Sequence, residues 1–247
     1  MEKENQHYRM YENTAHKITL LRQKRLHPRL WYAQFSLAPF SHSQALTVAH
    51  VLRRVLLSEI ETTACTGVKI EGVFHELSLL PGIQESIPEI LTNIRNLVFT
   101  NLPQKTENQP TRAQIFHHGK KIVTAKDINL PSHLQVVDPA QPIATLVSDH
   151  SVFSVDMHLT ESKGYSQPSG CVGSSPFQES KSPSPLLPID AVFLPVKKVN
   201  YVLQHHSYHE SIVFEIWTDG SISPQKALAK ASFALRTLFS PFTATSA

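Results

Sequence analysis

The sequence is short of glycine and cysteine, and each shortage excludes some kinds of protein. Its 247 residues include 8 glycines and 2 cysteines. It contains no Gly-x-Gly-x-x-Gly run, no phosphate-cradling loop and no Gly-x-Ser-x-Gly elbow, so the commonest dinucleotide-binding, P-loop and serine-hydrolase motifs are missing. Cys65 and Cys171 lie far apart with no Cys-x-x-Cys pair. We therefore expect reduced thiols in a protein that is not secreted.

Long apolar runs and a large charge excess are missing as well. No stretch approaches the ~18 apolar residues of a membrane span, and the acidic start, Met-Glu-Lys-Glu, fits neither a signal peptide nor a transit peptide. We expect no membrane contact and a function in the compartment where the chain is made. The net charge of +3 is too small to indicate nucleic-acid binding by itself. The basic segment 17–29 is interpreted as a solvated strand or arm, with phosphate contact as the less favoured alternative.

The hydrophobic pattern predicts an α+β fold with a strand-rich middle between two helix-bearing ends. Apolar and polar residues alternate from Trp31 to Leu37, which predicts a half-buried strand ending at Pro39. Apolar residues at helical spacing predict a helix over 45–60 and another after Ser86, its expected N-cap. A third helix is expected to begin at Ser223-Pro224.

Between these helices the pattern is mostly that of strands. Further strands are expected around 68–71, 143–147, 152–159 and 211–218, and a hairpin is expected to turn near Gly119. Ser, Pro and Gly make up 14 of the 23 residues of 166–188, so this segment is predicted to be a mobile loop.

Three histidines form the best metal-binding candidate: His205, His206 and His209. Positions 205 and 209 would share one face of a helix, but they lie between two strand-like segments and no Cys or carboxylate follows at ligand spacing. We expect an exposed loop there, with no metal and no cofactor. A small metal-dependent enzyme using residues 205–209 remains the alternative. No pair of carboxylates is spaced for acid–base catalysis, so no catalytic residue is expected.

The helix expected over 45–60 carries two adjacent arginines inside its apolar run. At ~100° per residue, Arg54 lies on the polar side of the helix while Arg53 falls between Leu46 and Ala49 within the apolar arc. The Arg53 stem could cover apolar surface with its guanidinium in water, and Arg54 could simply be solvated.

The apolar residues of 45–60 span roughly two-thirds of the helix circumference, and the helix after 223 adds a second stripe. Two-fold pairing is the commonest way to bury such surface, so we predict a homodimer.

Six segments, taken in order, resemble the N-terminal portion of the α subunit of bacterial-type RNA polymerase, as found in bacteria and plastids. They are LRRVLLSEI (52–60), VKIEGVFHELSLLPGIQESIPEILTNIRNL (68–97), VTAKDI (123–128), KGYSQPS (163–169), DAVFLPVKKVNYVL (190–203) and FEIWTDGSISPQKALAKASFAL (214–235). None is a catalytic signature, but the ordered set covers most of the chain and is specific.

The resemblance implies a noncatalytic scaffold within a nucleotidyltransferase complex. Members of the family dimerise, and the dimer is the platform on which the two large catalytic subunits assemble, with DNA reached only through the complex. The implied architecture is a discontinuous dimerisation subdomain, 1–62 and 190–247, with a strand-rich subdomain, 63–189, inserted. Large-subunit binding is expected at Arg53, Arg54 and Leu57. Dimer contacts are expected at Val48, Leu52, Val55, Leu228, Leu235 and Leu238.

Two departures from the family pattern affect these expectations. The family has approximately G-F-G-H-T-L-G-N-A-L-R-R where this chain has SQALTVAHVLRR, and the loss of all three glycines favours helix formation while altering the surface for dimer packing. Many members continue into a small helical domain that contacts promoter DNA, whereas this sequence stops at Ala247. We therefore expect no DNA-reading domain within it. The divergence, without a transit peptide, favours a plastid-encoded protein over one of the bacterial cytoplasm.

Overall fold

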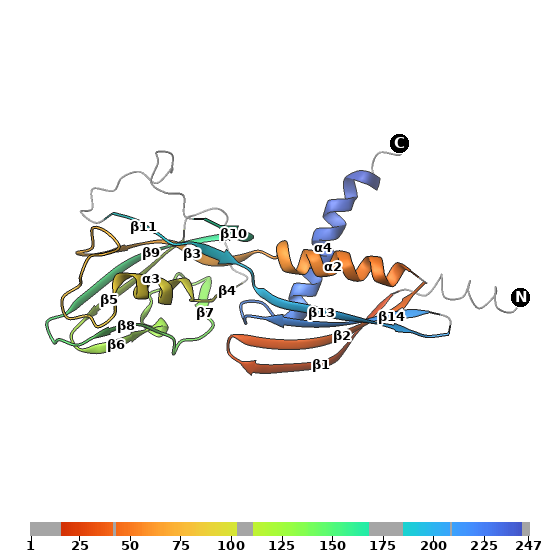
Figure 1. Cartoon of the computed structure of the whole chain (residues 1–247), viewed down its shortest axis with the longest axis horizontal. Coiled ribbons are helices and arrows are strands. Elements are labelled where there is room, and N and C mark those ends of the chain that lie inside the picture. The colour runs from red at the N-terminus through yellow and green to blue at the C-terminus, as the bar shows by residue number, and fades with distance from the viewer. Residues whose placement is uncertain (1–15, 42, 103–110, 168–184, 208, 244–247) are drawn as a thin grey trace, which may run out of the picture. The chain divides into compact units, whose positions relative to one another are not determined.

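The computed structural model describes residues 16–41, 43–102, 111–167, 185–207 and 209–243. The chain divides into two compact units, which are described separately. Unit 1 comprises residues 1–60 and 194–247, and unit 2 comprises residues 61–193 (Figure 1). Helices and strands are both present and strands predominate, which confirms the mixed, strand-rich character that the hydrophobic pattern predicts.

In its described residues, unit 1 is an antiparallel sheet covered on one face by two helices (Figure 1). The strands are ordered β1-β2-β14-β13 across the sheet. Their bounds are Lys17–His27 (β1), Leu30–Phe40 (β2), Val196–His205 (β13) and Glu210–Thr218 (β14), and the helices are Gln44–Ser58 (α2) and Pro224–Thr243 (α4). Because β2 pairs directly with β14, the two ends of the chain form one sheet.

Alternation along the strands builds the core of unit 1. Ala33, Phe35 and Leu37 of β2 are buried as the sequence predicts, and they share one cluster with buried side chains of α2 and α4. The strand does not end at Pro39, however, and continues to Phe40. A register shift in β14 between Glu210 and Ile212 lies opposite this point, and such irregular positions tolerate a proline because its missing N–H is not needed by the ladder. Every residue of β1 is exposed, in agreement with the solvated strand expected for the basic segment.

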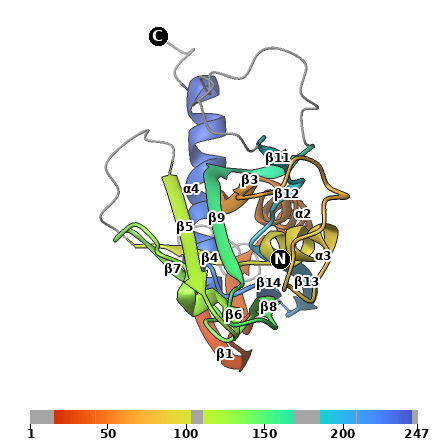
Figure 2. The ribbon, with the colours of Figure 1, turned by 90° about the vertical axis from the view of Figure 1, so that its left-hand side faces the viewer.

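Where the structure describes it, unit 2 contains one four-stranded antiparallel sheet, ordered β11-β3-β9-β5, and three two-stranded ones, β10-β12, β4-β7 and β6-β8 (Figures 1 and 2). Its longer elements are Thr62–Ile70 (β3), Ile87–Arg95 (α3), Thr111–His118 (β5) and Val152–Ser162 (β9). The shorter strands are Phe99–Asn101 (β4), Lys121–Thr124 (β6), Leu134–Val136 (β7), Pro142–Leu146 (β8), Gly164–Ser166 (β10), Leu187–Pro188 (β11) and Ala191–Phe193 (β12), and Ala125–Asp127 forms a 3-10 turn.

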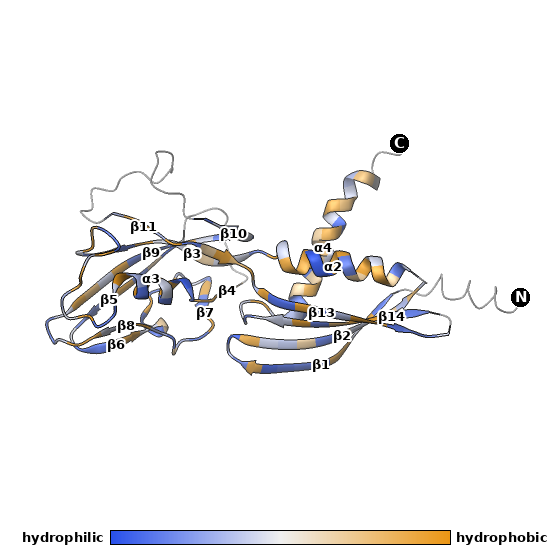
Figure 3. Cartoon of the chain, viewed as in Figure 1, coloured by the Kyte–Doolittle hydropathy of each residue, from blue (hydrophilic) through white to orange (hydrophobic). Residues whose placement is uncertain are grey.

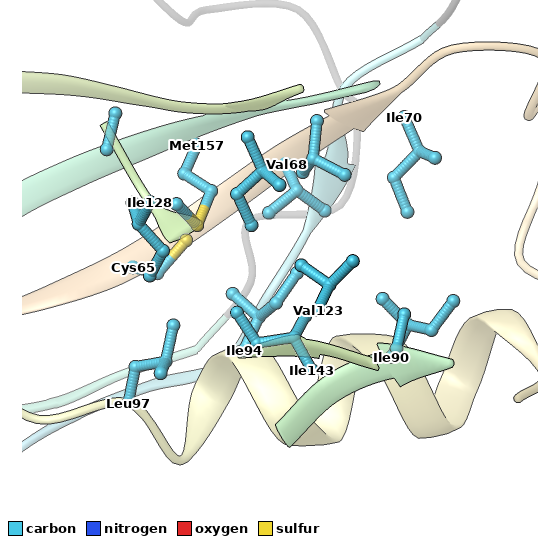
Figure 4. Packing of buried hydrophobic residues seen from close by; sticks show 14 of the residues in the cluster. Cys65, Val68, Ile70, Ile90, Ile94, Leu97, Val123, Ile128, Ile143 and Met157 are labelled. Carbon is cyan, nitrogen blue, oxygen red and sulfur yellow. The ribbon is translucent and has the colours of Figure 1, made fainter. Parts of the chain in front are cut away.

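Helix α3 closes the core of unit 2. It begins directly after Ser86, as predicted, and the Glu89 carboxylate accepts hydrogen bonds from the Ser86 N–H (2.8 Å) and hydroxyl (2.9 Å), which stabilises the first turn. Ile90 and Ile94 point from the helix toward β3 and β9, where Met157 belongs to the same cluster (Figure 4). Ile87, Ile90 and Ile94, on one face of α3, are therefore buried in the core of this unit.

The turn at Gly119 is present, but the predicted hairpin is not. Gly119 has a φ of 88°, a conformation that favours glycine. The flanking strands pair elsewhere, β5 with β9 and β6 with β8, because strand partners are chosen by the burial of whole faces rather than by the nearest turn. The strand expected over 68–71 is likewise longer and runs through Thr62–Ile70.

Two further sequence-based expectations concern loops and cysteines. Residues 168–184, the greater part of the Ser/Pro segment, lie outside the described residues. Cys65 is free and buried, and burial raises the pKa of its thiol to about 12, so it is protonated at neutral pH. Cys171 lies outside the described residues.

A buried carboxylate organises the turn between β14 and α4. Asp219 is mostly buried, and its Oδ1 accepts hydrogen bonds from the Ser221 N–H (3.0 Å) and hydroxyl (2.5 Å). The Lys197 Nζ is 3.9 Å from Oδ2. Burial raises the pKa of Asp219 above its ordinary 3.8, and this effect outweighs the Ser221 hydrogen bonds and the Lys197 charge, which lower the pKa. The folded state thus binds this proton more tightly than the unfolded state, and the stability associated with it is lost as pH rises through the folded pKa.

Replacing Asp219 tests this linkage. Asp219→Asn keeps an oxygen acceptor for Ser221 and cannot ionise, so we expect a higher melting temperature than that of the native chain at pH 7. The difference should shrink as the pH is lowered toward 4. Asp219→Ala, the control, also cannot ionise but leaves the Ser221 donors without an acceptor, so it should be less stable than Asp219→Asn by ~1–3 kcal/mol at every pH. Thermal unfolding followed by circular dichroism between pH 4 and 8 measures both; an Asn variant less stable than the native chain at pH 7 would contradict the assignment.

Candidate assembly surface

Helix α2 buries one narrow stripe against the sheet of unit 1. The buried side chains recur at helical spacing and are Ala45, Ala49, Leu52, Val55 and Leu56. Leu46 is 45% exposed, and Val48 and Leu57 are only half-buried. The apolar arc that the fold actually covers is therefore narrower than the two-thirds of the circumference that the sequence suggests.

Both arginines of α2 are exposed. Arg54 lies on the polar side, as predicted, whereas Arg53 does not lie in the buried arc, because its neighbour Leu46 is itself left uncovered. Within the described part of the chain, neither guanidinium forms an ion pair. Figure 3 shows the result as a hydrophilic band across the middle of α2. The two arginines thus offer planar, multidentate donors to a partner.

A hydrogen bond fixes the polar side of α2 to the sheet. The Tyr201 hydroxyl of β13 is 3.1 Å from the His50 Nε2, and the two rings meet edge to face at 5.5 Å. His50 lies on the same side of α2 as Arg54 by helical spacing. The arginines are therefore carried by a helix anchored at several points, which favours a preformed contact surface.

Helix α4 changes character along its length. Ala227, Leu228 and Ala231 are buried in the core of unit 1. Beyond them four large apolar side chains are exposed, with Leu238 at 62% and Phe242 at 76%. We call this set the α4 apolar half; its members are Phe233, Leu238, Phe239 and Phe242 (Figure 3). Helical spacing predicts an apolar stripe on this helix formed by Leu228, Ala231, Leu235, Leu238 and Phe239. Phe242, one turn beyond Leu238, continues that stripe, whereas Phe233 lies on another side of the helix.

The residues predicted to form the dimer interface are divided by the structure. Leu52, Val55 and Leu228 are buried in their own unit's core, so we reassign these three from the interface to the fold. Val48 and Leu235 are half-buried and pack at the edge of that core. Leu238 is exposed, and it is the predicted interface residue with the most surface left to bury.

The three histidines do not share a helix face. His205 ends β13, and its Nδ1 is 3.0 Å from the buried Glu210 Oε1 at the start of β14. The rings of His206 and His209 stack with centroids 4.6 Å apart. Among the described residues, no group of three His, Cys, Asp or Glu side chains is arranged to hold a metal ion. The hairpin therefore gives no support to the metal-enzyme alternative.

None of the described helices has the length and apolarity needed to cross a membrane.

Leu52 and Arg53 provide a matched pair for testing which face of α2 is structural. Leu52 is 5% exposed, so Leu52→Ala should cost ~2–5 kcal/mol of unfolding free energy. Arg53→Ala should change it by less than ~0.5 kcal/mol, as is usual for an exposed side chain. Urea unfolding of the two variants and the native chain measures the difference. A loss above ~1 kcal/mol for Arg53→Ala would show that its stem packs on the apolar surface after all.

Comparisons with known proteins agree with one another. The profile of the RNA polymerase Rpb3/RpoA insert domain matches residues 68–194. Proteins named DNA-directed RNA polymerase subunit alpha align over most of the chain. That of Cyanidium caldarium is 37% identical over 229 residues, covering 91% of this chain and 70% of its own length. Those of Synechococcus sp. (strain JA-3-3Ab) and Angiopteris evecta are 38% and 39% identical, covering 85% and 87% of this chain.

The chain spans 62% and 60% of the length of these last two relatives. The alignments nevertheless run through both units and include the arginine-bearing helix, whose residues carried the resemblance. This protein therefore belongs to the family of DNA-directed RNA polymerase α subunits.

Proposed function

We propose that this chain is a noncatalytic assembly subunit of a DNA-dependent RNA polymerase. It forms a homodimer through unit 1, and the dimer binds the large catalytic subunits, so that duplex DNA is reached only through the complex. In the bounds expected from the family, the discontinuous subdomain 1–62 and 190–247 dimerises and 63–189 is the insert. The observation that carries the proposal is the α4 apolar half, since a helix that ends in four exposed large apolar side chains needs a partner surface.

The energetics of the α4 apolar half favour a symmetric partner. Fully burying a Leu or Phe side chain contributes ~1.5–3 kcal/mol. A two-fold interface buries one copy of each such residue from each of the two protomers. Eight side chains would contribute at most on the order of 12–24 kcal/mol, against association costs of ~4–15 kcal/mol. The balance supports a stable dimer.

The exposed arginines of α2 fit the second contact. Arg53 and Arg54 stand side by side without intramolecular ion pairs in the described structure, and the half-buried Leu57 lies one turn further along the helix. Guanidinium groups bind carboxylates and carbonyls bidentately, so a large protein subunit is a suitable partner. Truncating one member of an interfacial charge pair typically costs ~2–5 kcal/mol.

The organisms of the relatives support a plastid as the compartment of this protein. They come from photosynthetic eukaryotes such as Cyanidium caldarium and Angiopteris evecta, and from bacteria such as Synechococcus. Together with the divergence of residues 43–54 from the family pattern, this favours a plastid, with the bacterial cytoplasm as the alternative.

Dimerisation is tested with a single charge placed on α4. The native chain should have twice its mass of 27.7 kDa in multi-angle light scattering. Leu238→Glu should shift it to monomer or aggregate, because the charge would be buried in the interface. Gln225→Glu, an exposed residue of the same helix, adds the same charge away from the apolar half and should leave the dimer intact. A well-behaved native monomer would refute the proposal.

Large-subunit capture is tested with Arg54. Arg54→Ala should fold and dimerise as the native chain does, yet retain the large polymerase subunits at least tenfold less well in a pull-down from the native source. Lys230→Ala, another exposed cation, is the control and should retain them fully. Dimer content of the same samples separates the two functions. Equal capture by Arg54→Ala would mean that the arginine is only a solvated charge. A native dimer that captures no large subunit would contradict the assembly role and would favour a third possibility, an interaction protein of the same fold that acts outside the polymerase.

A further inference from the structure

The face of the unit 1 sheet turned away from α2 and α4 carries an ordered set of aromatic and basic side chains. Residues directly opposite one another in antiparallel strands lie on the same face, and alternate residues of each strand take the other face. The buried residues Ala33 and Ile216 are paired on the helix-covered face. Two rows of four therefore cross the opposite face: Lys24, Tyr32, Trp217 and Lys198, then Arg22, Gln34, Glu215 and Asn200.

Two aromatic rings form the centre of this outer face. The Tyr32 and Trp217 ring centroids are 5.0 Å apart at 45°, and both residues remain partly exposed. The Lys198 Nζ lies 4.9 Å from the Trp217 ring centroid. The Tyr32 hydroxyl donates a 2.9 Å hydrogen bond to Glu215. The rings are thus held in place in the absence of any ligand.

The charge on the outer face is predominantly positive. Of the eight side chains in the two rows, Arg22, Lys24 and Lys198 are cations, and all three are exposed. Glu215 is the one carboxylate among them, and it already accepts the Tyr32 hydroxyl. Lys197 is not counted because it faces Asp219 at 3.9 Å. The face therefore presents cations on either side of an aromatic centre.

We propose that this sheet face binds single-stranded nucleic acid, with bases stacked on Tyr32 and Trp217 and phosphates beside Arg22, Lys24 and Lys198. Neighbouring strands lie ~4.8 Å apart, so the three spacings from β1 to β13 separate the two ends of the first row by ~14 Å. That span accommodates two stacked bases between the flanking cations. A sheet face that stacks two or three bases on aromatic residues is an established mode of RNA binding in other folds.

Magnitudes show that a base can displace Lys198 from the Trp217 ring. An exposed cation–π contact contributes ~0.5–1 kcal/mol, whereas stacking of a base on an aromatic ring contributes ~1–3 kcal/mol. The base takes the ring, and the released ammonium is then free to contact a phosphate. The intramolecular contact keeps the ring ordered until the ligand arrives.

The aromatic centre favours this ligand over the two obvious competitors. An acidic polypeptide would satisfy the cations but would make no use of the two flat rings. Duplex nucleic acid keeps its bases stacked on one another, so only its phosphates can reach the face, and three cations give weak binding at physiological salt. The proposal uses neither the α4 apolar half nor Arg53 and Arg54, and it holds or fails independently of polymerase assembly.

The test measures fluorescence anisotropy of labelled 12-nucleotide oligouridylate and oligothymidylate on the full chain, beside a duplex of the same length and a 12-residue polyglutamate. Single strands should bind at least tenfold more tightly than either competitor. Trp217→Leu should weaken single-strand binding at least tenfold. Trp217→Phe, which keeps a stacking ring, should stay within about threefold of the native chain, and this rescue distinguishes lost stacking from lost folding.

The charge contribution is measured by salt dependence. Replacing both Lys24 and Lys198 by Gln should reduce the slope of log affinity against log salt by about 1.4, since each phosphate contact on a single strand contributes about 0.7. The matched control is Lys226→Gln with Lys230→Gln, two exposed cations of α4, which should leave the slope unchanged. Polyglutamate or duplex binding as tight as that of single strands, or single-strand binding that survives Trp217→Leu, would overturn the proposal.

Discussion

The pairing of β2 with β14 is the contact on which unit 1 depends. It joins a strand near the start of the chain to one near its end, and each strand buries one alternating face in the same apolar cluster. Both helices of the unit pack on the sheet that this pairing completes. Without it, neither α2 nor the first half of α4 would have an apolar surface to cover. The two segments of unit 1, which unit 2 separates in the sequence, would also not be joined in one sheet.

The same sheet decides which side chains remain available to partners. Its helix-covered face accepts one stripe of α2, so Arg53 and Arg54 are left in solvent on a helix that is otherwise anchored. It also accepts only the first turns of α4, and the α4 apolar half continues beyond it. The proposed dimer and large-subunit contacts thus arise from one cause, helices that carry more apolar and cationic surface than the sheet can bury. The outer sheet face, with Tyr32 and Trp217, is a third surface left by the same arrangement.

Helical periodicity identified the faces of α2 but not the width of the buried arc. Leu46 and Leu52 are equally apolar, yet one is 45% and the other 5% exposed, because burial depends on where the sheet lies and not on the side chain alone. For this reason Arg53 was expected in the apolar arc and lies outside it, and Leu52, Val55 and Leu228 belong to the core. The pairing of β5 and β6 with separate partners has a similar origin, since a turn at Gly119 specifies a change of direction and no strand partner.

The sequence alone determined the local elements and the family. Alternation from Trp31 to Leu37, the Ser86 cap and the Ser223-Pro224 helix start are local signals, carried by side-chain period and backbone preference. The ordered segments between 52 and 235 pointed to the polymerase α family because they span both units. Only the tertiary structure decided which strands pair, which part of each apolar helix face is covered, and that Lys24, Tyr32, Trp217 and Lys198 meet in one row. These are contacts between residues far apart in the chain, and they form only when whole faces compete for burial in a shared core.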